Sequence, residues 1–307
     1  MVPSPEDFVV MDDRFISIRN DYRQVMVRYD RRFRALWYAL SPRPRPCFNL
    51  GILAELRHLH RTIVDANRKA QARDLALPVR YTVLSSLSPG VFNLGGDLEL
   101  FLRLITARDR RGLLDYATAC IDVLYPNAVH FDLPMTTISL VKGEALGGGC
   151  EAAISSNIVV AERSARFGLP EILFNLIPGM GAYSFLIRRT TPDITDRLIT
   201  TGEILTAEQM RDLGLVDILA DDGQGERTVL DYLQRHERRH NAHLALNQVR
   251  RCVNPLTYEE LIRITEIWVE AALQLQGRDL KMIRKLIAAQ DRKAGAADGA
   301  RKMAQEG

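Results

Sequence analysis

Three consecutive glycines, residues 147–149, separate a strand-like segment from a helix-like segment in the stretch "GEALGGGCEAAISSN" (143–157). Glycine adopts backbone angles that other residues avoid, and it lets a second group approach the backbone closely. The small, alanine-rich residues that follow are typical of a helix, and a helix start carries unpaired N–H groups and the positive end of the peptide dipoles. This junction therefore predicts a backbone site for an electron-rich atom.

A second junction of the same kind occurs in "FNLGGDL" (92–98). Two such junctions side by side would direct two N–H groups at one oxygen atom, which is how an oxyanion hole is built. Phosphate binding is the competing use of a helix start. Neither junction matches GxxxxGK[ST] or GxGxxG at its proper place, so nucleotide binding has little support.

The order of the predicted elements indicates an α/β fold. Hydrophobic patterns predict strands at 33–40, 79–87, 136–146 and 158–162, helices at 50–73 and 97–125, and mostly helical structure from residue 192 onward. Strands that alternate with helices favour a mainly parallel sheet with helical crossovers. We expect an irregular lead-in at 1–30, a core with the active site at 31–225, a C-terminal helical region at 226–293 and a disordered tail at 294–307.

Two glutamates border apolar sequence close to the glycine triplet 147–149 or shortly after it. Glu151 follows the glycines directly, and Glu171 lies in "FGLPEILF". Burial would raise the pKa of either carboxyl and suit it to proton transfer near neutral pH. Each residue has a plainer explanation, because a glutamate in the first turn of a helix also complements the helix dipole.

Composition excludes several classes of protein. The net charge of +3 is too small to indicate nucleic acid or a membrane surface as a partner. The four cysteines are widely spaced and form no CxxC pair, which argues against a metal site and for reduced thiols. The N-terminal residues do not resemble a secretory signal, and no apolar run approaches the roughly 20 residues of a membrane span. We therefore expect a soluble, cytoplasmic protein that needs no metal or redox cofactor.

Four motifs in order resemble the crotonase (enoyl-CoA hydratase/isomerase) superfamily. They are "FNLGGDL", "GEALGGGCEAA", "FGLPEILFNLIPGMGAYSFL" and "LTAEQMRDLGLVDIL". The resemblance implies a spiral of ββα units, an outlying C-terminal helical region, and trimers that can pair into hexamers. It also implies that the backbone N–H groups of Gly96 and Gly148 hold a thioester carbonyl.

A narrower resemblance points to the diffusible-signal-factor synthases (RpfF type). It is carried by "VFNLGGDLELF", "GMGAYSF" and "RITEIWVEAALQL" together with the basic last helix. It implies dehydration of a 3-hydroxyacyl thioester on acyl carrier protein, then thioester hydrolysis to a free cis-2-unsaturated fatty acid that serves as a cell–cell signal. The implied acid/base pair is Glu151 and Glu171, and the implied acyl pocket contains Leu146, Gly147, Met180, Trp268 and Leu286. Cys150 departs from the signal synthases and agrees with general hydratases.

Other interpretations remain open at this level. Cys150 supports a hydratase or isomerase acting on acyl-CoA, and a third possibility is a mainly regulatory protein that binds a sensor kinase. Trp268 lies in an apolar helical stripe of a kind that is more often ordinary core or a trimer contact. Four basic residues could dock an acidic carrier protein, although solvated charge explains them as well: Arg251, Arg263, Arg284 and Lys285.

Overall fold

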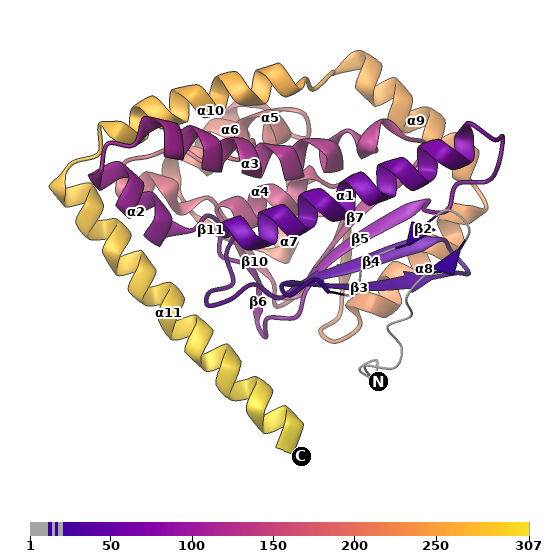
Figure 1. Ribbon diagram of the computed structural model, residues 1–307, viewed down its shortest axis with the longest axis horizontal. Coiled ribbons are helices and arrows are strands. Elements are labelled where there is room, and N and C mark those ends of the chain that lie inside the picture. The colour runs from indigo at the N-terminus through magenta and orange to yellow at the C-terminus, as the bar shows by residue number, and fades with distance from the viewer. Residues whose placement is uncertain (1–11, 14–15, 18–20, 307) are drawn as a thin grey trace.

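The computed structural model describes residues 12–13, 16–17 and 21–306, and its body is built on two β-sheets (Figure 1). The larger sheet has the strand order β12-β9-β7-β5-β4-β3. Its strands are β3 (Val25–Asp30), β4 (Ala35–Leu40), β5 (Tyr81–Ser86), β7 (Thr136–Val141), β9 (Ile158–Glu162) and β12 (Ile218–Ala220). All neighbours in it are parallel except β3 and β4.

The smaller sheet is formed by strands of three residues each. Its order is β11-β10-β8-β6, with β6 (Val91–Asn93), β8 (Glu144–Leu146), β10 (Arg166–Gly168) and β11 (Ile204–Thr206). The chain alternates between the sheets: β5 leads to β6, β7 to β8 and β9 to β10, and a helix follows each pair. This repeated ββα path is the spiral that the resemblance implied, and the predicted α/β fold class is confirmed.

Helices cover both faces of the larger sheet. On one side lie α1 (Leu50–Gln71), α3 (Arg110–Ala128) and α10 (Tyr258–Leu273), and on the other lies α8 (Gly225–Glu237) (Figure 1). Side chains of β4 alternate between the two cores: Leu36, Tyr38 and Leu40 pack beneath α1, whereas Ala35 and Trp37 face the α8 side. This alternation follows from the two-residue repeat of a strand.

The remaining helices complete the spiral and the C-terminal region. They are α2 (Leu98–Thr106), α4 (Gly148–Ser155), α5 (Ala182–Ile187), α6 (Pro192–Thr201), α7 (Ala207–Asp212), α9 (His240–Val253) and α11 (Gly277–Glu306), with a 3₁₀ turn at η3 (Pro170–Phe174). In Figure 1, α11 runs away from the end of α10 along the outside of the body.

Several predicted elements have different bounds in the structure. The helix predicted at 97–125 is two helices, α2 and α3, which meet at a turn where Arg108 has φ of 50°. The strand predicted at 136–146 is two strands, β7 and β8, with Gly143 between them; Gly143 packs so closely on Gly90 that a β-carbon there would overlap the Gly90 carbonyl group. The break lets β7 and β8 join different sheets.

Both ends of the chain also differ from the expected domain plan. Part of the lead-in predicted at 1–30 is regular, because β3 pairs antiparallel with β4, and the short β1 (Asp12–Asp13) pairs with β2 (Ile16–Ser17). The residues before 12 lie outside the described residues. At the other end, α11 continues as a helix through 294–306, where a disordered tail was expected.

Candidate active site

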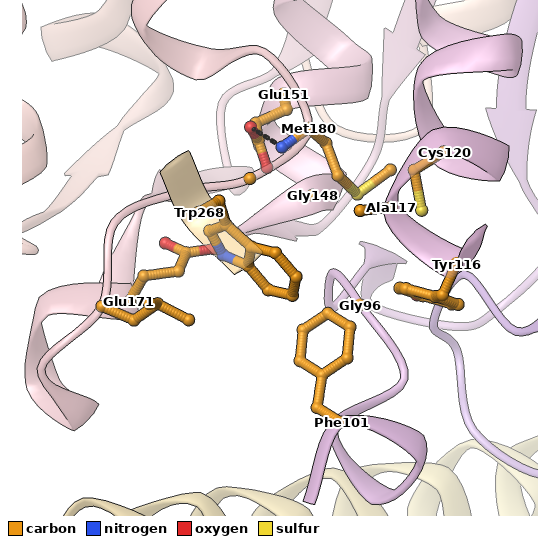
Figure 2. Close-up of a pocket in the computed structure, with 12 residues that line it drawn as sticks. Gly96, Phe101, Tyr116, Ala117, Cys120, Gly148, Glu151, Glu171, Met180 and Trp268 are labelled. Atoms are coloured by element: carbon orange, nitrogen blue, oxygen red, sulfur yellow. Dashed lines mark hydrogen bonds between the residues drawn. The ribbon is translucent and has the colours of Figure 1, made fainter. Parts of the chain in front are cut away.

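A cavity lies where the two glycine-rich junctions meet α3 and α10 (Figure 2). It contains six of the nine site residues proposed from sequence. These are Gly96, Gly148, Glu151, Glu171, Met180 and Trp268. Leu146, Gly147 and Leu286 do not line it. The structure therefore brings both predicted acids and both predicted oxyanion-hole glycines to one space.

The two predicted backbone donors stand on turns that touch each other. A β-carbon at Gly95 would lie 3.0 Å from the amide nitrogen of Gly148, and Gly95 has φ of 95°, which favours glycine. The Tyr116 hydroxyl fixes the turn that contains Gly95 and Gly96, by donating to the Phe48 carbonyl and accepting from the Asp97 N–H at 3.0 Å. Gly148 is the first residue of α4, so its N–H has no intrahelical acceptor.

Each glycine of the triplet is required by a different neighbour. Gly147 has φ of 52° and ψ of −127°, and a β-carbon there would lie 2.5 Å from Oε1 of Glu171. A β-carbon at Gly148 would overlap the Met180 sulfur. One at Gly149 would overlap the carbonyl oxygen of Asn93. The triplet thus leaves room for an acid, for a cavity wall and for the close packing of α4 on β6.

Glu151 is buried in the first turn of α4 and is held by two backbone donors. Its Oε1 accepts hydrogen bonds from the N–H groups of Met180 at 2.7 Å and Ala182 at 2.9 Å. The second carboxyl oxygen is left for other contacts, and the residue is only 1 % exposed. Figure 2 shows this carboxyl above Gly148 with its bond to Met180.

Glu171 comes from η3 and reaches the cavity from the opposite side to α3 (Figure 2). The residue as a whole is half-buried, but its Oε2 is inaccessible and has no hydrogen-bond partner among the described residues. A buried carboxyl oxygen without a partner is unfavourable when it is charged. This position therefore favours the protonated acid or a bound hydrogen-bond donor.

Both carboxyls have raised pKa values. For Glu151 burial raises the pKa, and the two amide hydrogen bonds oppose this effect. For Glu171 burial again raises the pKa, and the charge of Glu151 raises it further. Two neighbouring acids of this kind exchange protons as a pair near neutral pH, as acid/base catalysis requires.

The cavity wall includes residues that the sequence did not reveal. Trp268 of α10 is 2 % exposed, and its ring lies 5.0 Å from the ring of Phe101. Gly179 gives the indole room, since a β-carbon there would lie 2.7 Å from Nε1. The lining residues that were not predicted are Phe101, Tyr116, Ala117, Cys120, Leu176 and Gly179. Tyr116 and Cys120 are one helical turn apart on α3, which was the available signal.

Three predicted pocket residues have other positions. Leu146 ends β8, and its carbonyl oxygen would lie 3.0 Å from a β-carbon at Gly95, so its backbone supports the first turn. Gly147 lies next to the Glu171 carboxyl, because a β-carbon at Gly147 would be 2.5 Å from Oε1 of Glu171. Leu286 is on α11, where it is partly buried against the main core. These three residues do not line this cavity, and their assignment to the acyl pocket stays a prediction.

A family model described as enoyl-CoA hydratase/isomerase matches residues 73–287, which is more than half of the chain. This chain belongs to the enoyl-CoA hydratase/isomerase family. The match includes both glycine-rich junctions and both glutamates.

Two curated relatives in the family align with parts of the chain. A 2,3-dehydroadipyl-CoA hydratase from Escherichia coli (strain K12) is 40% identical over 100 residues, 32% of this chain and 38% of the relative. The fatty acid oxidation complex subunit alpha of Idiomarina loihiensis is 36% identical over 140 residues, 45% of this chain and 19% of the relative. The chain thus spans less than two fifths of either relative.

Solved structures agree in fold over most of the chain. A putative enoyl-CoA hydratase from Streptomyces avermitilis has a TM-score of 0.69 at 18% identity, covering 89% of this chain and 92% of that one. DspI of Pseudomonas aeruginosa has a TM-score of 0.56 at 22% identity, covering 89% and 99%. At these identities the similarity establishes the shared fold.

Within residues that the structure describes, no helix combines the length and apolar character needed to cross a bilayer. Among the same residues, no three His, Cys, Asp or Glu side chains are grouped to hold a metal ion.

Proposed function

We propose that this protein dehydrates a 3-hydroxyacyl thioester to the cis-2-enoyl thioester and then hydrolyses the thioester. The product is a free cis-2-unsaturated fatty acid that acts as a cell–cell signal. The single observation that carries the proposal is the convergence of Glu151, Glu171, Gly96 and Gly148 on one largely apolar cavity.

The dehydration step uses the two carboxyls in opposite roles. One carboxylate removes a proton from C2, and the other carboxylic acid protonates the C3 hydroxyl, so that the C3–O bond breaks and water leaves. The negative charge that develops on the thioester oxygen is held by the amides of Gly96 and Gly148. Losing one such donor typically lowers the rate by about 10²–10³.

The hydrolysis step uses the same groups. A carboxylate activates a water molecule, which attacks the thioester carbonyl while the two amides stabilise the tetrahedral oxygen. The C–S bond then breaks, and the thiol leaves with a proton from the acid. Both steps need acids whose protons are exchangeable near neutral pH, and the raised pKa values of Glu151 and Glu171 support this.

The choice of a signal synthase rests on the sequence motifs "VFNLGGDLELF" and "RITEIWVEAALQL". The second motif contains Trp268, and its place in the cavity wall supports the narrow assignment. On this proposal the substrate is linked to acyl carrier protein, the enzyme is a homotrimer or a hexamer, and a sensor kinase is a regulator.

A second candidate is reversible hydration of trans-2-enoyl-CoA. It is favoured by Cys150, which is buried next to the catalytic glutamate, and by the hydratase among the relatives. It needs the same four groups but no hydrolysis, so little free acid would form.

The test is a direct comparison of thioesters. Purified protein is given 3-hydroxydodecanoyl groups on carrier protein and on CoA, and products are identified by mass spectrometry. We expect free cis-2-dodecenoic acid from the wild type, with Glu151→Gln and Glu171→Gln each at least about 10²-fold slower. Glu144→Gln is the matched control, because Glu144 is partly exposed and pairs with Lys293. Hydration of trans-2-enoyl-CoA without free acid would favour the second candidate. Full product formation by both glutamine variants would refute the proposal.

A further inference from the structure

The Gly96 amide belongs to a turn whose conformation its own residues do not fix. Gly95 comes directly before it with φ of 95°, and glycine has the widest choice of backbone angles. The direction of the Gly96 N–H depends on the plane of the Gly95–Gly96 peptide, which rotates about the single bonds on either side of it. Contacts from outside the turn are therefore needed to hold this peptide in one orientation.

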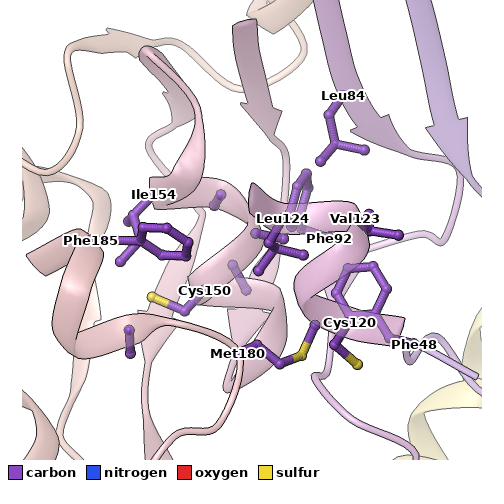
Figure 3. Close-up of a cluster of buried hydrophobic side chains, with 14 of the residues drawn as sticks. Phe48, Leu84, Phe92, Cys120, Val123, Leu124, Cys150, Ile154, Met180 and Phe185 are labelled. Carbon is purple, nitrogen blue, oxygen red and sulfur yellow. The ribbon is translucent and has the colours of Figure 1, made fainter. Parts of the chain in front are cut away.

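Two such contacts come from the segment that leads into α1. The Gly95 carbonyl, in the same peptide as the Gly96 N–H, accepts a hydrogen bond from the Phe48 N–H at 2.8 Å. Carbonyl and N–H point in opposite directions in a trans peptide, so this bond directs the Gly96 N–H away from Phe48. The Phe48 ring lies in the buried cluster of Figure 3, which holds the donor in place. The Leu94 N–H also donates to the Pro46 carbonyl at 2.7 Å.

Another contact comes from the C-terminal helix, more than 190 residues away in the sequence. Nε2 of Gln290, on α11, donates to the carbonyl oxygen of Leu94 at 3.2 Å. Gln290 is 7 % exposed, although Ala288 and Asp291 on the same helix are exposed. The Leu94 carbonyl belongs to the peptide directly before Gly95. This bond therefore fixes the plane from which the flexible glycine continues.

The same turn of α11 also contacts segments next to both glycine-rich junctions. Lys293 is three residues after Gln290, so the two side chains share one face of the helix. Lys293 pairs with Glu144 of β8, the strand that leads into the glycine triplet. Asp291 pairs with Arg45, in the segment that leads into α1. One turn of α11 thus spans the two junctions that carry the proposed oxyanion-hole donors.

The buried amide differs in kind from the two ion pairs beside it. The side chains of Lys293 and Glu144 are 38% and 32% exposed, and that of Asp291 is 52% exposed. Exposed ion pairs between flexible side chains contribute little. The buried Gln290 side chain has less freedom, and a carbonyl oxygen only accepts, so the amide must present its NH₂ group to Leu94. Neither a carboxylate nor a hydrocarbon side chain can replace it.

We propose that Gln290 is a positioning residue for the oxyanion hole: it holds the turn so that the Gly96 amide is directed at the thioester carbonyl, and the docking of α11 completes the hole. This inference rests on the proposed function, because it assumes that the Gly96 N–H binds that carbonyl. An oxyanion-hole donor acts most strongly on the oxygen as negative charge develops there. Misplacing the donor therefore lowers kcat more than it raises KM.

The first test is the kinetic effect of removing the Gln290 bond. Gln290→Met keeps the size of the side chain but cannot donate, and Gln290→Asn keeps the amide but is one methylene shorter. With the thioester that the wild type converts faster in the comparison above, we expect kcat to fall about tenfold in each variant and KM to stay within about twofold. This is less than the roughly 10²–10³ that follows the outright loss of a donor.

Asp291→Asn is the matched control for the two Gln290 variants. It removes the neighbouring ion pair of α11 with Arg45 and leaves the Leu94 carbonyl untouched, so kcat and KM should equal those of the wild type. Equal kcat values in the wild type and in a folded Gln290→Met or Gln290→Asn protein would overturn the proposal. An equal fall in kcat in Asp291→Asn would assign the effect to the docking of α11 in general and would also overturn the role given to Gln290.

The second test observes the carbonyl without turnover. 3-Hydroxydodecanoyl-CoA labelled with ¹³C at the thioester carbon is bound to the Glu171→Gln protein, and infrared difference spectra locate its C=O stretch. Hydrogen bonds to a carbonyl oxygen lower the frequency of this band. We expect a downward shift from the frequency in buffer, a smaller shift when Gln290→Met or Gln290→Asn is added, and the full shift with Asp291→Asn.

The infrared band separates this inference from the proposed function, because it reports on the carbonyl whatever reaction follows. A full downward shift in both Gln290 variants would refute the positioning role. A smaller shift in both variants, with no free fatty acid formed by the wild type, would support the positioning role and count against the proposed function alone. A band at the frequency in buffer in the parent Glu171→Gln protein would refute both, since no amide would then hold the carbonyl.

Discussion

A β-carbon at Gly147 would stand 2.5 Å from Oε1 of Glu171. These two residues are far apart in the sequence and come from different turns of the spiral. Gly147 also has φ of 52° with ψ of −127°, a combination that residues with a side chain avoid. The first glycine of the triplet therefore sets the position of an acid on another element, and it does so by having no side chain.

Gly147→Ala should displace Glu171 and lower activity by about 10²-fold, because small misplacements of a catalytic group have effects of this size. Activity with the preferred thioester and the melting temperature check this. Gly223→Ala is the matched control: Gly223 has φ of 79° and nothing within 4 Å of its β-carbon position. It should lose about 1 kcal/mol of stability through backbone strain alone and keep full activity. Equal activity in the two variants would contradict the role given to Gly147.

Glu171→Gln should make the protein more stable at alkaline pH. The pKa of Glu171 is raised in the folded state by burial and by the charge of Glu151. The stability linked to a raised carboxyl pKa is fully present below the unfolded value of about 4.3 and is lost as pH rises through the folded value. Glutamine stays neutral, so the decline in melting temperature between pH 5 and pH 8 should be smaller. A decline in melting temperature equal to that of the wild type would mean that ionisation of Glu171 does not destabilise the folded protein.

His60→Phe should reduce sensitivity to acid. Burial lowers the pKa of His60 to about 3, so the stability linked to this histidine is present above the unfolded value of about 6.5 and is lost as pH falls toward the folded value. The free energy of unfolding lost through His60 on lowering the pH to 5 is about 2 kcal/mol. Chemical unfolding at pH 7 and pH 5 measures it. His58→Phe serves as the control. If His60→Phe loses as much free energy of unfolding between pH 7 and pH 5 as the wild type does, His60 is not held neutral by its burial.

The parts of the fold that the sequence predicted are those with local signals. The strands at β4, β5 and β9 and the helix α1 follow from hydrophobic period, and both glycine-rich junctions follow from composition. The smaller sheet was not predictable, because its strands have only three residues and show no period. The close contact between Gly143 and Gly90 joins neighbours in space that no local pattern reveals.

The site shows the same division. Glu151 and the glycines were readable from the glycine-rich junctions, and Glu171 was readable because it borders apolar sequence in "FGLPEILF". The walls were not readable, since Phe101 and Cys120 enter the cavity from helices whose apolar positions resemble ordinary core. Leu286 was placed in the pocket from resemblance, whereas the structure places it on α11 against the main core.

Arg188 should be important for the wall that Trp268 forms. Its guanidinium donates to both carboxyl oxygens of Glu260, at 2.8 and 2.7 Å, and also to the carbonyl of Ser184 at 2.9 Å. Glu260 lies in the first turn of α10, two turns before Trp268, so this pair connects α5 to the start of that helix. The two side chains are 17% and 33% exposed, so the pair is partly shielded from water.

Arg188→Ala should therefore destabilise the protein by about 2 kcal/mol, because among the described residues it leaves the partly buried Glu260 carboxylate with only the Ser184 hydroxyl as a side-chain donor. Arg188→Lys should recover only part of the loss, since lysine cannot donate to both oxygens in the same fork. Arg227→Ala removes an exposed pair with Asp231 on α8 and should cost less than about 0.5 kcal/mol. Urea unfolding measures the three values, and tryptophan fluorescence reports whether Trp268 loosens first. Equal losses for Arg188→Ala and Arg227→Ala would mean that the Glu260 contact does not hold α10 in place.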